Sequence, residues 1–285
     1  MLMMAAQSDP LTPDWPAGRG EATLERIDAR TRITRSRAAA PLKLLCPQRP
    51  GDAAWLYATT FGGGLVAGDA IDLHLTVGPG AAAVVTTQAS TKVFHHQGGL
   101  GASQRLTAEV AAGATLVIAP DPLVCFENAM YHQHQRVHVD PAGTLVLLDW
   151  FTAGRVAFGE RWDFVRYASR NEVIIDGRTV AIDALLLDPE DGVLSELARM
   201  GPFDCVATAL LVGERLGAVC DRLVQQVHDL PVEPGSPLVV AASRTPWGAM
   251  LRLAGQTTPV VAEELKARLG FIGDIVGSSP WERKW

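Results

Sequence analysis

Cysteine is scarce in this sequence and never occurs at a metal-binding spacing. Four cysteines stand among 285 residues, at positions 46, 125, 205 and 220. Because there is no Cys-x-x-Cys pair, the sequence indicates neither a zinc knuckle nor a framework of disulfides. We therefore expect buried, free thiols.

Long hydrophobic runs and an excess of positive charge are also missing. No apolar run approaches the roughly 20 residues that a membrane helix needs, and the first residues lack the basic leader of a secretory signal. The 31 acidic and 25 basic residues give a formal net charge of -6, which argues against a general nucleic-acid binder. The sequence thus predicts a cytoplasmic protein whose partners are neither nucleic acid nor membrane.

Catalytic motifs are absent as well. Neither a Gly-x-Ser-x-Gly elbow nor a His-Glu-x-x-His occurs. Gly62, Gly64 and Ala67 fit the loose dinucleotide fingerprint, but alternating apolar residues predict a strand where the fingerprint needs a helix. No Gly-Lys-Ser/Thr follows Gly68, so the phosphate loop is missing too. We expect tight glycine turns here and no enzymatic activity, although carboxylates paired only in space stay open.

What the sequence does contain is a repeat of strands and glycine turns. Gly80, Gly113, Gly143 and Gly177 follow one another at intervals of 33, 30 and 34 residues. Each lies between two apolar, strand-like segments, and no amphipathic helix separates the copies. A period of this size is typical of stacked units that share one continuous core. The sequence therefore predicts a mainly β, β-helix-like stack.

The flanks of the repeat complete the predicted architecture. We expect a flexible leader over 1–19 and a single β-rich domain over 20–285, with a first strand over 20–33. A few helices are predicted to pack on the stack in the C-terminal half, over 194–200, 213–230 and 259–269. Between them we expect a buried strand over 238–242 and another over 249–253. The tryptophan-containing tail is expected either to fold back into a groove or to meet a partner.

Histidines form one pattern with metal-ligand character. His132, His134 and His138 fall on alternate positions of a predicted strand, so their imidazoles share one face. Such a face can bind Ni(II), Cu(II) or Zn(II). Arg136 lies between two of them and would repel a cation, and a polar surface explains the same pattern. Both interpretations remain open.

Four ordered motifs resemble the urease accessory protein UreD (UreH) family. They are Gly62-Gly63-Gly64-Leu65-Val66-Ala67-Gly68-Asp69, Thr86-Thr87-Gln88-Ala89-Ser90-Thr91-Lys92-Val93-Phe94, Pro120-Asp121-Pro122 with Cys125-Phe126, and Gly154-Arg155 with Gly159-Glu160. The run from Asp149 to Arg155 and the ending Pro280-Trp281-x-Arg283-x-Trp285 resemble a longer, eukaryote-like branch of that family. The similarity extends from about residue 20 to the C-terminus.

The resemblance implies a non-enzymatic factor of urease maturation. Such a protein would bind apo-urease and recruit the F-type accessory protein, which holds the G-type GTPase that brings nickel. It would have a helix-poor stacked β fold and no tightly bound cofactor. Nickel would contact it only transiently, in an internal passage.

The same motifs carry oxygen donors that suit such a passage. A passage needs polar groups that replace water around an ion without trapping it. We predict that its lining is drawn from Asp69, Thr86, Thr87, Gln88, Asp149 and Glu160. The alternative is structural: the acids cap turns, the threonines satisfy strand ends, and the basic residues pair with them. The remaining motif residues, predicted to be structural, are Gly62, Gly63, Gly64, Gly68, Lys92, Gly154, Arg155 and Gly159.

From the residues alone, a second class of function stays open. A small-ligand or metal-binding β protein, or a hydrolase whose site assembles from distant residues, would share the glycine turns without any role in urease maturation. Co-purification with apo-urease separates the two classes.

Overall fold

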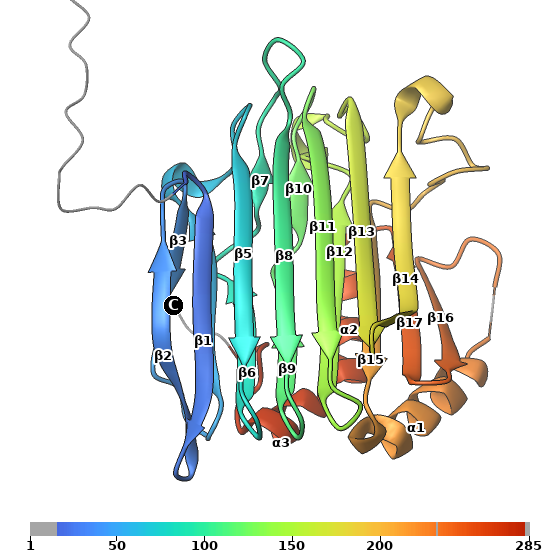
Figure 1. The fold of residues 1–285 in the computed structure, drawn as a ribbon. Helices are drawn as coiled ribbons and strands as arrows, with labels where there is room; N and C mark the ends of the chain where they lie inside the picture. Colours follow the sequence, from blue (N-terminus) through green and yellow to red (C-terminus); the bar gives the residue numbers. More distant parts are fainter. Residues whose placement is uncertain (1–15, 232, 283–285) are drawn as a thin grey trace, which may run out of the picture.

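Two β-sheets lie face to face in the computed structural model, which describes residues 16–231 and 233–282. Sheet A, at the front of Figure 1, contains β1 (Arg19–Ile27), β2 (Arg30–Ala38), β5 (Ala70–Val77), β8 (Ala102–Val110), β11 (Met130–Val139), β13 (Arg166–Ile175) and β14 (Arg178–Leu187). Sheet B contains β3 (Leu42–Leu45), β4 (Ala54–Thr60), β6 (Ala82–Thr87), β9 (Thr115–Ile118), β12 (Thr144–Thr152), β15 (Cys205–Val212), β16 (Leu238–Thr245) and β17 (Gly248–Gly255), with the short β7 (Lys92–Val93) and β10 (Leu123–Cys125) at its margin.

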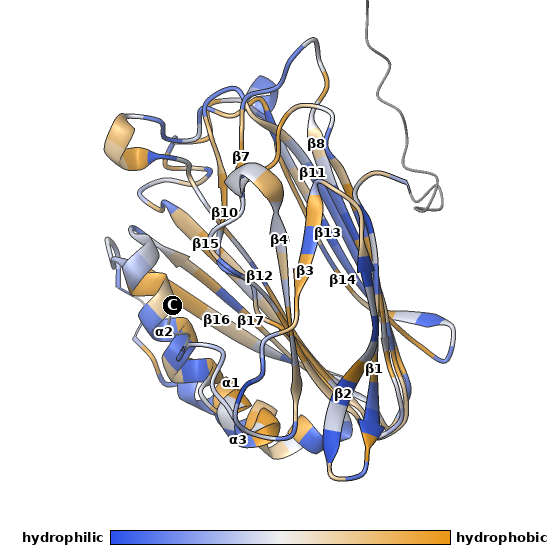
Figure 2. Ribbon diagram, turned by 90° about the vertical axis from the view of Figure 1, so that its left-hand side faces the viewer, coloured by the Kyte–Doolittle hydropathy of each residue, from blue (hydrophilic) through white to orange (hydrophobic). Residues whose placement is uncertain are grey.

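Three helices cover the outer face of sheet B (Figure 2). They are α1 (Gly217–His228), α2 (Thr258–Leu269) and α3 (Ile272–Val276). Single 3-10 turns are η1 (Phe61–Gly63), η2 (Val156–Phe158), η3 (Pro189–Asp191) and η4 (Glu214–Leu216). In the described part of the chain no helix combines the length and the apolar character needed to cross a membrane.

The first three copies of the predicted repeat each connect the two sheets. Gly80 lies between β5 and β6, Gly113 between β8 and β9, and Gly143 between β11 and β12, so that each copy places one strand in each sheet. Equivalent strands of successive copies pair in parallel, as in a solenoid. The predicted mainly β, stacked fold with C-terminal helices is confirmed.

The fourth copy differs from the first three. Asp176 and Gly177 form a tight turn with φ values of 49° and 72°, and β14 folds back antiparallel on β13 within sheet A. Positive φ at both turn residues matches the two-residue hairpin turns whose twist suits antiparallel strands. The prediction of a fourth stacked unit is therefore wrong, and the parallel stack ends here.

The central strands of sheet B are buried on both faces, which explains their near-continuous apolar sequences. Leu116 and Leu147 belong to the core between the two sheets. Val117, Leu148 and Leu265 belong to a second core, between sheet B and the helices. Neighbouring residues along one strand thus enter different cores, as the alternation of a β-strand requires.

Several predicted elements need correction. The strand expected over 20–33 is a hairpin of β1 and β2, because Asp28 turns the chain with a φ of 54°. Residues 194–200 form turns instead of a helix: the side chain of Leu197 is 88% exposed, so an apolar helix face would gain no burial there. β16 lies at the sheet edge and is partly exposed, so the prediction of a buried strand is wrong.

The other late elements follow the prediction. The helix expected over 213–230 is present as η4 followed by α1, and the strand over 249–253 and the helix over 259–269 are β17 and α2. Three cysteines are buried and free as expected, whereas Cys46 is exposed. β1 already begins at Arg19; residues 1–15 of the predicted leader lie outside the described residues. Trp281 packs against the second core, and the end of the tail is also outside the described residues.

Candidate functional site

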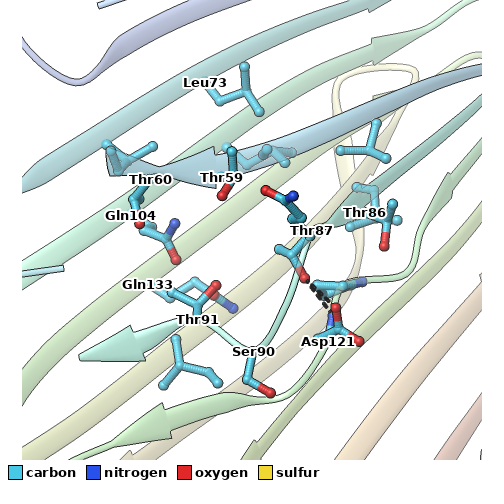
Figure 3. A pocket seen from close by; sticks show the side chains of 18 of the residues that line it. Thr59, Thr60, Leu73, Thr86, Thr87, Ser90, Thr91, Gln104, Asp121 and Gln133 are labelled. Atoms are coloured by element: carbon cyan, nitrogen blue, oxygen red, sulfur yellow. Dashed lines mark hydrogen bonds between the residues drawn. The ribbon is translucent and has the colours of Figure 1, made fainter. Parts of the chain in front are cut away.

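A cavity of about 380 Å³ lies between the two sheets, at the end of β6 opposite the Gly80 turn that precedes this strand. Figure 3 shows threonine, serine, glutamine and aspartate side chains around it. Thr86, Thr87 and Gln88, at the end of β6, line the cavity together with Asp149 from β12. The structure thus brings four of the six predicted passage residues to one place, and whether nickel uses it stays a prediction.

The threonines at the end of β6 are tied to the segment that follows β9. The Thr86 hydroxyl donates to the carbonyl oxygen of Ala119 over 2.6 Å. The Thr87 hydroxyl accepts a 2.8 Å hydrogen bond from the backbone N–H of Asp121 and lies 3.1 Å from that residue's Oδ2. Because β6 and β9 pair in parallel, these strand ends meet, and Asp121 becomes a second carboxylate at the cavity wall.

Asp149 is the carboxylate at the inner wall of the cavity. Its Oδ2 accepts hydrogen bonds from Ser169 Oγ over 2.6 Å and from Asn171 Nδ2 over 2.8 Å, both on β13. These bonds fix the side chain across the space between the sheets. An ionised carboxylate offers about four acceptor positions, so Asp149 retains capacity for a water or a cation.

Three glutamines that the sequence analysis did not single out complete the wall. Gln104, Gln133 and Gln135 reach inward from β8 and β11 and line the cavity. The Tyr131 hydroxyl donates to Gln104 Oε1, and Gln135 Nε2 donates to Asn171 Oδ1 over 2.9 Å. Burial, and next the charge of Asp149, raise the pKa of the Tyr131 hydroxyl well above its usual range, so it stays a donor.

Asp69 and Glu160 lie outside this cavity and have local partners. The Asp69 carboxylate accepts a 2.8 Å hydrogen bond from the backbone N–H of Val66, within its own turn. Glu160 pairs with Arg155, whose Nε donates over 2.8 Å, and also accepts from the backbone N–H of Glu127. These hydrogen bonds, the one from Arg155 foremost, lower the pKa of Glu160. The contacts match the structural alternative, and a passage role for these two residues stays a prediction.

The motif glycines occupy turns and points of close approach. A Cβ at Gly64 would lie 2.7 Å from the carbonyl oxygen of Lys92, and one at Gly154 would lie 2.9 Å from that of Glu160. Positive φ also occurs at Gly62, Gly63, Gly68 and Gly159. Lys92 is exposed, and its carbonyl accepts from the backbone N–H of Leu65 over 2.8 Å. Of these residues, Gly63 lines the cavity.

The histidines lie on the opposite, outward face of sheet A. His132 is exposed, and His134 Nε2 lies 3.5 Å from Glu172 Oε2. Among the described residues, no group of three or more histidine, cysteine or acidic side chains has the arrangement to hold a metal ion. A nickel-binding role for His132 and His134 stays a prediction.

Chemically, the cavity combines hard oxygen donors with apolar side chains and one guanidinium, that of Arg105, and has no thiolate. Burial raises the pKa of Cys125, and it raises that of Cys205 to about 12, so both thiols remain protonated. Carboxylate, hydroxyl and amide oxygens suit weakly held hard cations, whereas soft or imidazole ligands bind late transition metals more strongly. The cavity's oxygen donors are of the type that binds a hard cation weakly, and binding of a cation here stays a prediction.

Comparison with known proteins places the chain in one family. The family model described as UreD urease accessory protein matches residues 17–283. The urease accessory protein UreD of Sorangium cellulosum is 45% identical over 270 residues, which cover 94% of this chain and 85% of that protein. Urease accessory protein D of Oryza sativa subsp. indica is 35% identical, with 93% and 95% covered, and that of Arabidopsis thaliana is 31% identical, with 92% and 99% covered. The relatives include bacterial and plant proteins alike, and the chain belongs to the UreD family of urease accessory proteins.

Proposed function

We propose that this chain is a non-enzymatic factor of urease maturation that acts in the cytoplasm. It binds apo-urease and recruits the F-type accessory protein, which carries the G-type GTPase, for GTP-dependent insertion of nickel. Membership of the UreD family supports this role over an unrelated ligand-binding β protein or a hydrolase. The proposal adds that nickel passes through the cavity between the sheets.

The observation that carries the passage is a cavity whose partly apolar wall also contains hydroxyl, amide and carboxylate groups, inside an otherwise apolar sandwich. Burying polar groups is costly unless they are hydrogen-bonded, and cores are normally packed without voids much larger than a water molecule. The cavity of about 380 Å³ nevertheless persists beside Asp149 and Asp121. Six waters, the usual shell of a nickel ion, take up roughly 180 Å³ at about 30 Å³ each. A hydrated divalent ion therefore fits.

The donor types favour transfer over storage. Oxygen ligands hold Ni(II) less tightly than imidazole or thiolate does, so an ion at Asp149 stays exchangeable. Selectivity then comes from the partners that deliver and receive the metal. Such a passage requires that this chain provide a negatively charged, water-filled route and surfaces on which the partner proteins dock.

A reconstituted activation assay tests the proposal. The chain is co-expressed with apo-urease and the F-type and G-type proteins, and complex formation and the nickel-dependent rise of urease activity are measured. Asp149→Asn removes the charge and keeps the shape; we expect an intact complex and an activation rate lowered by about tenfold or more, the loss of one buried charge-assisted contact. Asp176→Asn, at an exposed turn, is the control and should match the parent.

Two results contradict the proposal. If the chain does not co-purify with apo-urease and its omission leaves activation unchanged, the maturation role is wrong. If the complex forms and Asp149→Asn activates urease like the parent, the role stands and the passage through this cavity is wrong.

A further inference from the structure

Polar side chains continue beyond the cavity as a strip across the interior of the sandwich. In sheet A, Gln135 is in register with Asn171, which is in register with Asp183. In sheet B, Asp149 is in register with Thr208, which is in register with Arg252. The cavity is lined as far as Gln135 and Asp149. The strip runs on from there to β14, the edge strand of sheet A, and to β17, which lies next to the edge strand β16 of sheet B, at the right of Figure 1.

These side chains point into the space between the sheets. Leu251 and Leu253, on either side of Arg252, belong to the core on the helix side of sheet B, so Arg252 faces sheet A. Ala181 and Leu185 of β14 pack on the core between the sheets, and Asp183, two positions from each, lies on the same face and points inward. The strip is thus a polar layer within an apolar core.

Hydrogen bonds and an ion pair join the two sides of the strip. Asn171 Nδ2 donates to Asp149 Oδ2 over 2.8 Å at the cavity end. Arg252 Nη2 donates to Asp183 Oδ1 over 2.6 Å at the edge. The Asp183 side chain is 14% exposed, whereas that of Arg252 is 58% exposed. A largely buried carboxylate on one sheet is therefore closed off by an arginine that lies mostly in solvent.

We propose that Asp183 and Arg252 form the gate of a second opening of the passage. Arg252 lies two strands from Asp149, about 10 Å at the usual strand spacing, so its positive charge stands in the way of a cation that leaves the cavity along the strip. When the arginine swings outward, Asp183 becomes the next carboxylate on the route for a small hydrated divalent cation. This inference rests on the proposed passage, and it adds where the route ends and what closes it.

The weakness of the Arg252–Asp183 ion pair favours a gate that opens. An ion pair with one partner in solvent is weak, so a divalent ion or a docked partner can displace Arg252. Asp183, in contrast, is held on a strand and keeps its inward direction. The Arg252 guanidinium therefore moves away, and the cation takes its place beside the Asp183 carboxylate, which stays where it is.

Opposite charge changes at the two residues test the gate. Arg252→Met keeps the length and removes the charge, and Asp183→Asn removes the carboxylate. In the reconstituted complex at limiting nickel, we expect Arg252→Met to raise the activation rate by about threefold and Asp183→Asn to lower it by about threefold, the size of one partly exposed ion pair. Equilibrium dialysis of the purified chain against nickel should show more metal retained by the first variant and less by the second.

A matched control removes a similar ion pair away from the strip. Arg244 of β16 pairs with Asp221 of α1 over 3.2 Å, on the helix side of the same edge. Arg244→Met should leave activation and nickel retention at the parent values. Arg252→Gln serves as a second neutral variant if Arg252→Met is poorly folded.

The outcomes separate this inference from the proposed function. If Arg252→Met and Asp183→Asn lower thermal stability equally and change activation in the same direction, or not at all, the pair is a clamp between the sheets and the gate is wrong. If Asp149→Asn slows activation in that case, the passage still stands. If Asp149→Asn matches the parent, the passage and the gate both fail.

Discussion

The two faces of β12 meet opposite requirements within one strand. Val146, Leu148 and Trp150 point to the helices and belong to an apolar core. On the other face, Leu147 and Phe151 belong to the core between the sheets, and Asp149 stands between them. The neighbouring residues Leu148 and Asp149 thus differ in role. Leu148 belongs to the core that supports the sheet, and Asp149 lines the cavity. Because the helix-side core holds sheet B, the space between the sheets can contain a polar cavity.

The largest effect is expected on the apolar face. Leu148 is fully buried, and Leu148→Ala leaves a cavity that the fold cannot close. We expect the free energy of unfolding to fall by about 2–5 kcal/mol, measured by chemical denaturation. Asp149→Asn, one residue away, serves as the comparison and should change it far less. If Leu148→Ala lowered the free energy of unfolding by less than about 1 kcal/mol, the helix-side core would not be what stabilises sheet B.

A smaller loss is expected from the polar face. Asn171 is 1% exposed, donates to Asp149 and accepts from Gln135. Asn171→Ala leaves both partners short of a hydrogen bond, which should cost about 1–3 kcal/mol. Thr76→Ala, at an exposed strand position of sheet A, is the control and should stay within about 0.5 kcal/mol of the parent. Equal losses for both variants would mean that the inner polar layer is not a fixed network.

Trp150 tests a contact that connects the two faces. Its ring lies in the helix-side core, and its Nε1–H donates to the carbonyl oxygen of Pro120 at the cavity wall over 2.8 Å. Trp150→Phe should lower the free energy of unfolding by about 0.5–1.5 kcal/mol for that bond, with a further small term for lost packing. Trp247→Phe, at a half-exposed ring, is the control. Unchanged stability would contradict a role for this bond in holding the wall.

The smallest effect concerns the acid stability provided by three carboxylates that pair with arginine. Hydrogen bonds from Arg166, Arg170 and Arg155 lower the pKa values of Asp188, Glu172 and Glu160 respectively. A carboxylate whose pKa is lower in the folded state stabilises the fold above its unfolded pKa, about 4, and this contribution is lost as the pH falls through the folded value.

Thermal unfolding between pH 7 and pH 3 checks this point. The midpoint temperature should be level above about pH 5 and fall below about pH 4. Asp188→Asn should show a slightly shallower fall, since its partner Arg166 is half exposed and the pair is screened by solvent. A midpoint that rises as the pH falls would reverse the sign of the argument.

The sequence predicted those parts of the fold in which one face is clearly apolar. The stacked strands, the glycine turns between sheets and the helices α1 and α2 all follow from such patterns. The inner polar layer did not, because β11 is polar on both faces: His132 and His134 point outward, while Gln133 and Gln135 point inward. Alternation alone does not say which polar face is buried.

The candidate site was predictable where a motif marked it. Thr86, Thr87, Gln88 and Asp149 lie in stretches that resemble the family, and all four line the cavity. Asp121 lies in the same kind of stretch, in Pro120-Asp121-Pro122, and the parallel pairing of β6 with β9 brings it to Thr87. The two residues are 34 positions apart, close to the 33-residue interval between Gly80 and Gly113, so the repeat spacing already places them in neighbouring copies.

The antiparallel hairpins at both ends of the parallel stack have a consequence for self-association. A repeat that pairs with its own next copy has an open end, and a further molecule with the same repeat can extend it into a fibre. Here β1–β2 and β3–β4 close one end, and β13–β14 and β15–β17–β16 close the other. The edge strand β2 also has a register shift against β1 and exposes Arg30 and Arg32, features that discourage pairing between molecules. These features disfavour polymerisation of the chain through its strand edges.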